Sequence, residues 1–181
     1  MDYNGPREAD GIVDYALHIL EESGVPPNVP QITSQKVFDD QCAGSANKIC
    51  ALLVVPHILD SSAKERNRYL DTLMNVAKGF RGTFSFGWTE IGAQSVLDEI
   101  VGVNFAPTLL VMSVEKKVSS MMKLSWSENN AKSYLDGALS GKEKMSPMGD
   151  GKIIKVSTIS AWDGKDAEIV EEPMEDWMKD D

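Results

Sequence analysis

The sequence contains few of the residues that carry thiol, metal or acid–base chemistry. Its 181 residues include only two cysteines, Cys42 and Cys50, and two histidines, His18 and His57. Two cysteines are too few for a disulfide-rich scaffold or a zinc site, and both histidines lie away from them in sequence. The pattern of acidic residues also lacks the Asp-x-Asp-x-Asp-Gly loop of an EF-hand. The sequence therefore indicates no specific metal site.

Long hydrophobic runs are also missing. No stretch reaches the roughly eighteen apolar residues that a membrane-spanning helix needs. The N-terminal "MDYNGPREADG" lacks the basic and apolar regions of a secretory signal. With 42% hydrophobic and 25% charged residues, the composition is that of a globular protein. We therefore expect either a cytosolic protein or a piece of a longer chain, with no membrane contact.

The charge is unevenly spread along the chain. Residues 163–181 contain nine acidic residues and two lysines, a net charge of −7, out of −10 for the whole chain. The other residues are close to neutral and offer no basic face, which argues against nucleic-acid binding. The composition of 163–181 is too polar to fold by itself, so we expect a disordered acidic tail.

Hydrophobic periodicity predicts alternating helices and strands. A capping box at Ser62–Glu65 opens the strongest helix, and a continuous apolar run precedes it, as in a strand covered on both faces. The expected helices span about 11–22, 35–43, 62–82, 92–101 and 128–139, and the expected strands about 31–35, 49–56, 83–88, 108–114 and 117–126. The alternation at 152–160 also allows a further edge strand. The order from residue 31, β-α-β-α-β-α-β-β-α, predicts a thioredoxin-like α/β fold, a mixed central sheet with helices on both faces.

In this fold, thiol chemistry needs a Cys-x-x-Cys at the start of the helix that follows the second strand, because the helix N-terminus stabilises the reactive thiolate. Here the sequence reads Ile58-Leu59-Asp60-Ser61, so we predict a redox-inactive loop. The neighbouring His57 has no nucleophile beside it in sequence, and we assign it no acid–base role.

Several motifs resemble the non-catalytic C-terminal domain of endoplasmic-reticulum protein disulfide isomerases, in the branch with two catalytic thioredoxin domains before it. They are "VPHILD" at 55–60, Arg66 and Tyr69, "WTE" at 88–90, "GAQS" at 92–95, "WDGKD" at 162–166 and the acidic tail. Tyr3, Gly5 and Arg7 resemble the pattern before the closing helix of a catalytic domain.

The resemblance implies a domain organisation. Residues 1–25 would be the final helix of a preceding catalytic domain, 26–30 a linker, 31–141 the redox-inactive domain, 142–162 an extension and 163–181 the tail. It also implies the endoplasmic reticulum lumen, with unfolded clients, chaperones and the catalytic domains of the same protein as partners. The ER-retention tetrapeptide of the family is not found after Asp181.

Three interpretations remain open for Cys42 and Cys50. The small polar residues between them allow the chain to turn back, so a structural disulfide is favoured in an oxidising lumen. Two free buried thiols and a working redox pair are the alternatives.

Two surfaces are candidates for binding. Thioredoxin folds place a cis proline where Ala106-Pro107 stands, and the apolar residues around it are candidates for a client or partner surface or a contact between domains. This candidate surface comprises His57, Ile58, Leu59, Phe105 and Pro107. The acidic tail is a candidate for weak Ca²⁺ binding or only a solvating segment. Its carboxylates belong to Asp163, Asp166, Glu168, Glu171, Glu172, Glu175, Asp176, Asp180 and Asp181.

The function that we predict is client or chaperone binding and scaffolding in oxidative folding, with isomerase chemistry done by domains outside this chain and with no cofactor. The alternatives are a thiol-disulfide oxidoreductase that uses Cys42 and Cys50, and a low-affinity calcium-binding module.

Overall fold

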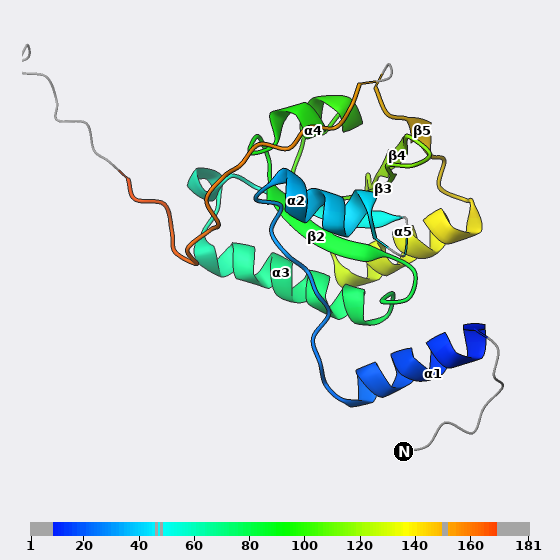
Figure 1. Ribbon diagram of the computed structural model, residues 1–181. Helices are drawn as coiled ribbons and strands as arrows, with labels where there is room; N and C mark the ends of the chain where they lie inside the picture. Colours follow the sequence, from blue (N-terminus) through cyan, green and yellow to red (C-terminus); the bar gives the residue numbers. More distant parts are fainter. Residues whose placement is uncertain (1–8, 46, 48, 150–151, 170–181) are drawn as a thin grey trace, which may run out of the picture.

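The protein is a three-layer α/β sandwich, seen here in a computed structural model that describes residues 9–45, 47, 49–149 and 152–169 (Figure 1). Its five-stranded sheet has the order β2-β1-β3-β4-β5. β1 and β2 are parallel, whereas β3, β4 and β5 pair antiparallel with their neighbours. The predicted thioredoxin-like α/β fold is confirmed.

Most of the predicted elements form close to their expected positions. The helices are α1 (Ala9–Glu22), α2 (Gln35–Phe38) continued by the π-helical turn η1 (Asp39–Ala43), the 3₁₀ turn η2 (Ile58–Asp60), α3 (Ala63–Lys78), α4 (Ser95–Val101) and α5 (Glu128–Ser140). The strands are β1 (Cys50–Val55), β2 (Ser85–Glu90), β3 (Thr108–Ser113), β4 (Val118–Met121) and β5 (Ser146–Pro147). The capping box of α3 is present, and the helix ends at Lys78, with Gly79 as its C-cap, instead of running to Gly82.

The two faces of the sheet form two separate hydrophobic cores. α3 and α5 cover one face, where the alternating Phe84, Phe86 and Trp88 are buried. α2, η1 and α4 cover the other face, around Phe38 and Leu97. β1 and β3 are buried along their whole length because helices cover them on both sides.

The predicted strand at 31–35 is wrong. Only Gln31 forms a bridge, parallel to Trp88 of β2. Pairing stops there because Ser34 already caps α2 and the carbonyl of Thr33 accepts a hydrogen bond from Ile159. The strand predicted at 117–126 is shorter for a similar reason, since the Thr108 hydroxyl donates to the carbonyl of Met122 just after β4 ends.

The edge strand that the sequence allows at 152–160 does not form. Over this range the chain crosses the α2–α4 face instead of lining the sheet edge (Figure 1). The backbone N–H groups of Val156 and Ser157 donate to the side chains of Gln35 and Gln94, each at 2.8 Å. Ile154 is buried in the core below. We call residues 152–166 the C-terminal strap.

Tyr134 of α5 gives a prediction for alkaline pH. Burial is the main cause that raises its pKa to about 12. Because the folded pKa lies above the unfolded value of ~10, the full stability is present below about pH 10 and falls as pH rises towards 12. We expect a loss of up to about 2 kcal/mol over this range that Tyr134→Phe does not show. Urea unfolding at a series of pH values measures it, and an identical loss in both proteins would contradict it.

Candidate functional site

The candidate site lies at the carboxyl end of β1, where the chain turns into α3. The register pairs Val55 with Glu90 of β2 and Val54 with Thr108 of β3. Pro107 therefore lies across from the end of β1, and the Ala106-Pro107 bond is cis. The sheet thus brings the loop after β1 beside Pro107, as the sequence predicts for the candidate surface.

This corner exposes apolar side chains. Leu59 is 66% exposed and Phe105 is 39% exposed, while Ile58 and Pro107 are partly buried. Nothing in the described chain covers Leu59 or Phe105 fully, so both are available for contact with another molecule.

His57 is held in place by two contacts. Its Nδ1 accepts a hydrogen bond from the Leu59 N–H at 3.2 Å, so the proton of the neutral ring sits on Nε2. Nε2 lies 3.2 Å from a carboxylate oxygen of Glu90. Both nitrogens are therefore engaged, and the nearby Ser61 hydroxyl donates to the carbonyl of His57 rather than to its ring. This geometry makes His57 a structural residue of the turn.

A buried arginine joins the elements around this turn. The side chain of Arg66, on α3, is 2% exposed, and its guanidinium pairs with Glu90. It also donates to the carbonyl of Pro56 at 2.8 Å. Its cation lies 5.8 Å from the ring centre of Trp88 and 5.1 Å from that of Trp162, within cation–π range. Arg66 thus links α3, the end of β2, the loop after β1 and the C-terminal strap.

The strap ends on the start of α3. Trp162 donates from its backbone N–H to Gln31 and from its indole N–H to the carbonyl of Lys165, which closes a tight turn. Gly164 sits in that turn with φ +83°, a conformation that other residues rarely adopt. The turn brings the carboxylate of Asp166 to 2.6 Å from the N–H of Ala63, the first residue of α3.

The N–H groups of Ala63, Glu65 and Arg66 in the first turn of α3 therefore already have partners. Asp166 accepts from Ala63, and the Ser62 hydroxyl accepts from Glu65. In a site for thiol exchange, free N–H groups at this end of the helix would stabilise a thiolate together with the helix dipole. Here an aspartate carboxylate occupies that position.

Asp163 accepts a hydrogen bond from the N–H of Lys165, so two of the predicted calcium-tail residues have structural contacts.

The docked part of the chain thus extends beyond the predicted start of the tail at Asp163. Of the remaining tail carboxylates, Glu168 is described and exposed, and 171–181 lie outside the described residues. In the described chain, no three His, Cys, Asp or Glu residues come close enough to hold a metal ion. Its helices are also too short or too polar to cross a membrane.

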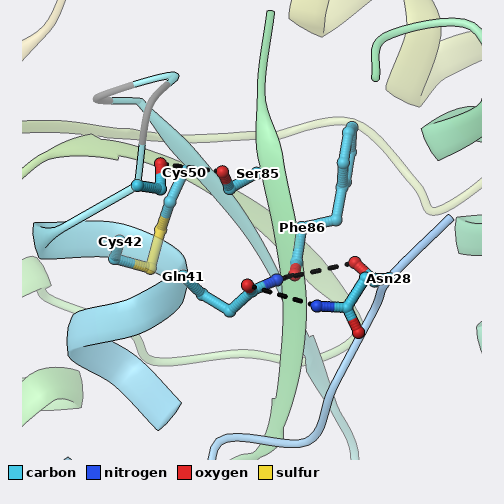
Figure 2. The surroundings of a disulfide bond; sticks show 7 residues. Asn28, Gln41, Cys42, Cys50, Ser85 and Phe86 are labelled. Atoms are coloured by element: carbon cyan, nitrogen blue, oxygen red, sulfur yellow. Dashed lines mark hydrogen bonds between the residues drawn. A yellow bond between two sulfur atoms is a disulfide. The ribbon is translucent and has the colours of Figure 1, made fainter. Parts of the chain in front are cut away.

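Cys42 and Cys50 are joined by a disulfide between η1 and the start of β1 (Figure 2). Both residues are 1% exposed or less and belong to the hydrophobic core under α2 and α4. Next to them, the Gln41 amide donates to the carbonyl of Phe86 at 2.6 Å and ties η1 to β2. The bridge lies at the opposite end of β1 from His57, so it does not replace the missing motif of the α3 N-terminus.

Sequence reasoning missed the cluster formed by Arg66, Glu90, Trp88, Trp162 and Asp166. All five residues lie in the sequence motifs on which the family resemblance rests, and these motifs were the one sign that they could act together. No pattern in the sequence, however, indicated that "WDGKD" would fold back onto α3.

Taken together, the strand order, the cis proline and the strand-to-helix turn define a thioredoxin-like domain without a thiol at the α3 N-terminus. Its curated homologues are protein disulfide isomerases. The chain is 34% identical to protein disulfide isomerase-like 2-3 of Oryza sativa subsp. japonica over 173 residues, covering 94% of this chain and 38% of that protein. It is 35% identical to protein disulfide-isomerase like 2-2 of Arabidopsis thaliana over 187 residues, covering 100% and 41%. With human protein disulfide-isomerase A6 it shares 31% identity over 179 residues, covering 97% and 40%.

The chain thus spans about two fifths of the length of these relatives. No protein-family model matches it. Among solved structures, the bb fragment of ERp72 is similar with a TM-score of 0.49 and 16% identity, over 80% of this chain and 60% of that one. Human ERp44 is similar with a TM-score of 0.40 and 15% identity, over 78% and 37%.

Proposed function

We propose that this chain is the non-catalytic thioredoxin-like part of a protein disulfide isomerase of the endoplasmic reticulum lumen. It binds clients or partner chaperones and scaffolds thiol exchange that catalytic domains outside residues 1–181 perform. The observation that carries the proposal is the Asp166 carboxylate on the Ala63 N–H, at the helix end where a reactive thiolate would need to be.

The burial of the only disulfide supports the same proposal. An incoming thiolate must reach a sulfur in line, and neither cysteine exposes more than 1% of its surface. An oxidoreductase that uses Cys42 and Cys50 would have to open the core around Phe38 and Leu97 at each turnover.

The absence of thiol chemistry is tested by the rate of insulin reduction in the presence of the chain, with dithiothreitol as the reductant. We expect a rate equal to that of dithiothreitol alone, because no thiolate is accessible at α3. A clear acceleration that Cys42→Ser removes would overturn the proposal in favour of an oxidoreductase. The double variant Cys42→Ser, Cys50→Ser is the thiol-free control, since it removes both cysteines of the chain and leaves the α3 N-terminus unchanged.

The client surface is tested by the aggregation of a reduced, alkylated test protein in the presence of the chain. Leu59→Ser and Phe105→Ser together are expected to weaken the protection, because they remove the exposed apolar contacts of the candidate surface. Leu139→Ser is the matched control, since Leu139 is 46% exposed on the last turn of α5 and lines a hollow with Ile49, at the opposite end of β1. Equal loss of protection in both variants would argue against a client site at this corner.

A further inference from the structure

A second surface, unrelated to the turn after β1, lies along the outer edge of β4. Here a groove of about 640 Å³ runs between β4, α5 and the loop that leads from α5 to β5. Its walls carry three lysines, Lys123, Lys142 and Lys144, with Glu143 as the acidic residue among them. We call it the β4-edge groove.

The backbone of β4 is only partly covered on this side. Met122 donates its N–H to the carbonyl of Leu109 in β3 at 2.9 Å. In an antiparallel strand, the backbone groups of successive residues point alternately to the two sides of the strand. The N–H and C=O of Met121 therefore point away from β3 and towards the groove. β5 pairs with Val118 and Ser119, and Met148 donates to the carbonyl of Lys117. Met121 is the next outward-facing residue, and in the described chain no backbone group pairs with it there.

The groove opens because the chain before β5 leaves the sheet edge. Strand pairing starts only at Ser146, so Lys142 and Lys144 stand apart from β4 instead of pairing with it. An exposed strand edge of this kind accepts another extended chain through main-chain hydrogen bonds. The uncovered position is short, which suits a peptide segment rather than a second sheet.

The charges of the groove select the kind of segment. Lys123, Lys142 and Lys144 are exposed, and none of them forms a salt bridge with a described carboxylate. With Glu143 they give the groove a net charge of +2, in a chain whose overall charge is −10. An extended segment with carboxylates would meet these lysines while its backbone pairs with Met121.

We propose that the β4-edge groove binds an extended acidic segment of a partner protein, which adds as a short strand beside β4. Its backbone bonds to Met121, and its acidic side chains contact the three lysines. This surface lies on the sheet edge opposite β2 and does not depend on the candidate site or on the function proposed for it.

The probe is a fluorescent peptide of alternating valine and glutamate, and binding to the full chain is followed by fluorescence anisotropy. The triple variant Lys123→Gln, Lys142→Gln, Lys144→Gln is expected to weaken binding about tenfold or more, as three exposed charge contacts do together. The matched control is Lys64→Gln, Lys78→Gln, Lys155→Gln, which removes three exposed lysines elsewhere and is expected to leave affinity within about twofold. Equal weakening in both variants would overturn the proposal.

Strand addition is tested separately on the unaltered chain. Amide hydrogen exchange of Met121 is expected to slow when the peptide binds, because its N–H gains a partner. A peptide with the same glutamates but proline in place of valine is expected to bind at least about tenfold more weakly, since proline cannot donate to a ladder. Equal binding of both peptides, or unchanged exchange at Met121, would rule out strand addition.

The acidic tail of the same chain is the competing occupant. The variant Glu171→Gln, Glu172→Gln, Glu175→Gln, Asp176→Asn removes four of its nine carboxylates. We expect unchanged affinity for the valine-glutamate peptide. An increase of about tenfold or more would assign the groove to this tail and overturn the assignment to a partner.

Discussion

Replacing Arg66 by alanine is expected to destabilise the protein by about 3–5 kcal/mol. The change leaves the Glu90 carboxylate, whose side chain is 17% exposed, without its main partner. It also removes the hydrogen bond to Pro56 and the cation that lies between Trp88 and Trp162. The free energy of unfolding in urea measures the loss.

Arg68→Ala is the matched control for this prediction. It removes the same side chain from the same helix at an exposed position, so we expect a change within about 0.5 kcal/mol. Glu90→Gln in the Arg66→Ala background is expected to recover part of the loss, because the partly buried carboxylate that has lost Arg66 no longer carries a charge. If Arg66→Ala and Arg68→Ala destabilise equally, the cluster does not hold this corner together.

The Arg66 cluster also predicts where the molecule loosens first. In Arg66→Ala, hydrogen exchange is expected to accelerate at Leu59 and at Trp162, since the elements that Arg66 joins lose their common partner. Phe38, in the core on the opposite face of the sheet, is expected to be affected only through the global stability.

Removal of the disulfide is expected to cost about 2–3 kcal/mol. The cysteines are eight positions apart, and the chain-entropy model gives this magnitude for a loop of that size. The double variant Cys42→Ala, Cys50→Ala is expected to lose this amount, because its unfolded state gains the freedom that the bridge removes. Urea unfolding with and without dithiothreitol measures the effect.

The dithiothreitol experiment contains its own control. Reduction should destabilise the unaltered chain by nearly the same amount and leave the double variant unchanged. Titration of free thiols in the unfolded, unreduced protein should give none. Two equivalents of free thiol there would contradict the bridge and restore the interpretation of two buried thiols.

The fold was largely predictable from local patterns. Each main element is specified by a short stretch of sequence. A continuous apolar run specifies β1, and the capping box at Ser62 specifies the start of α3. The alternating aromatic residues Phe84, Phe86 and Trp88 specify β2 and the residue before it. The missing thiols at residues 58–61 were also a property of the sequence alone. Prediction failed after Ile32 and at 152–160, because backbone groups there bind loop or side-chain partners instead of extending a strand ladder.

By itself, the sequence determined the order of helices and strands, the lack of a Cys-x-x-Cys at the start of α3 and the apolar character of the turn after β1. Only the tertiary structure decided what takes the place of the missing chemistry. Asp166 reaches Ala63, and Trp162 reaches Arg66, across about a hundred residues of chain. The exposed backbone of Met121 likewise depends on where β5 begins to pair. Such contacts depend on the path of the folded chain, which no local pattern encodes.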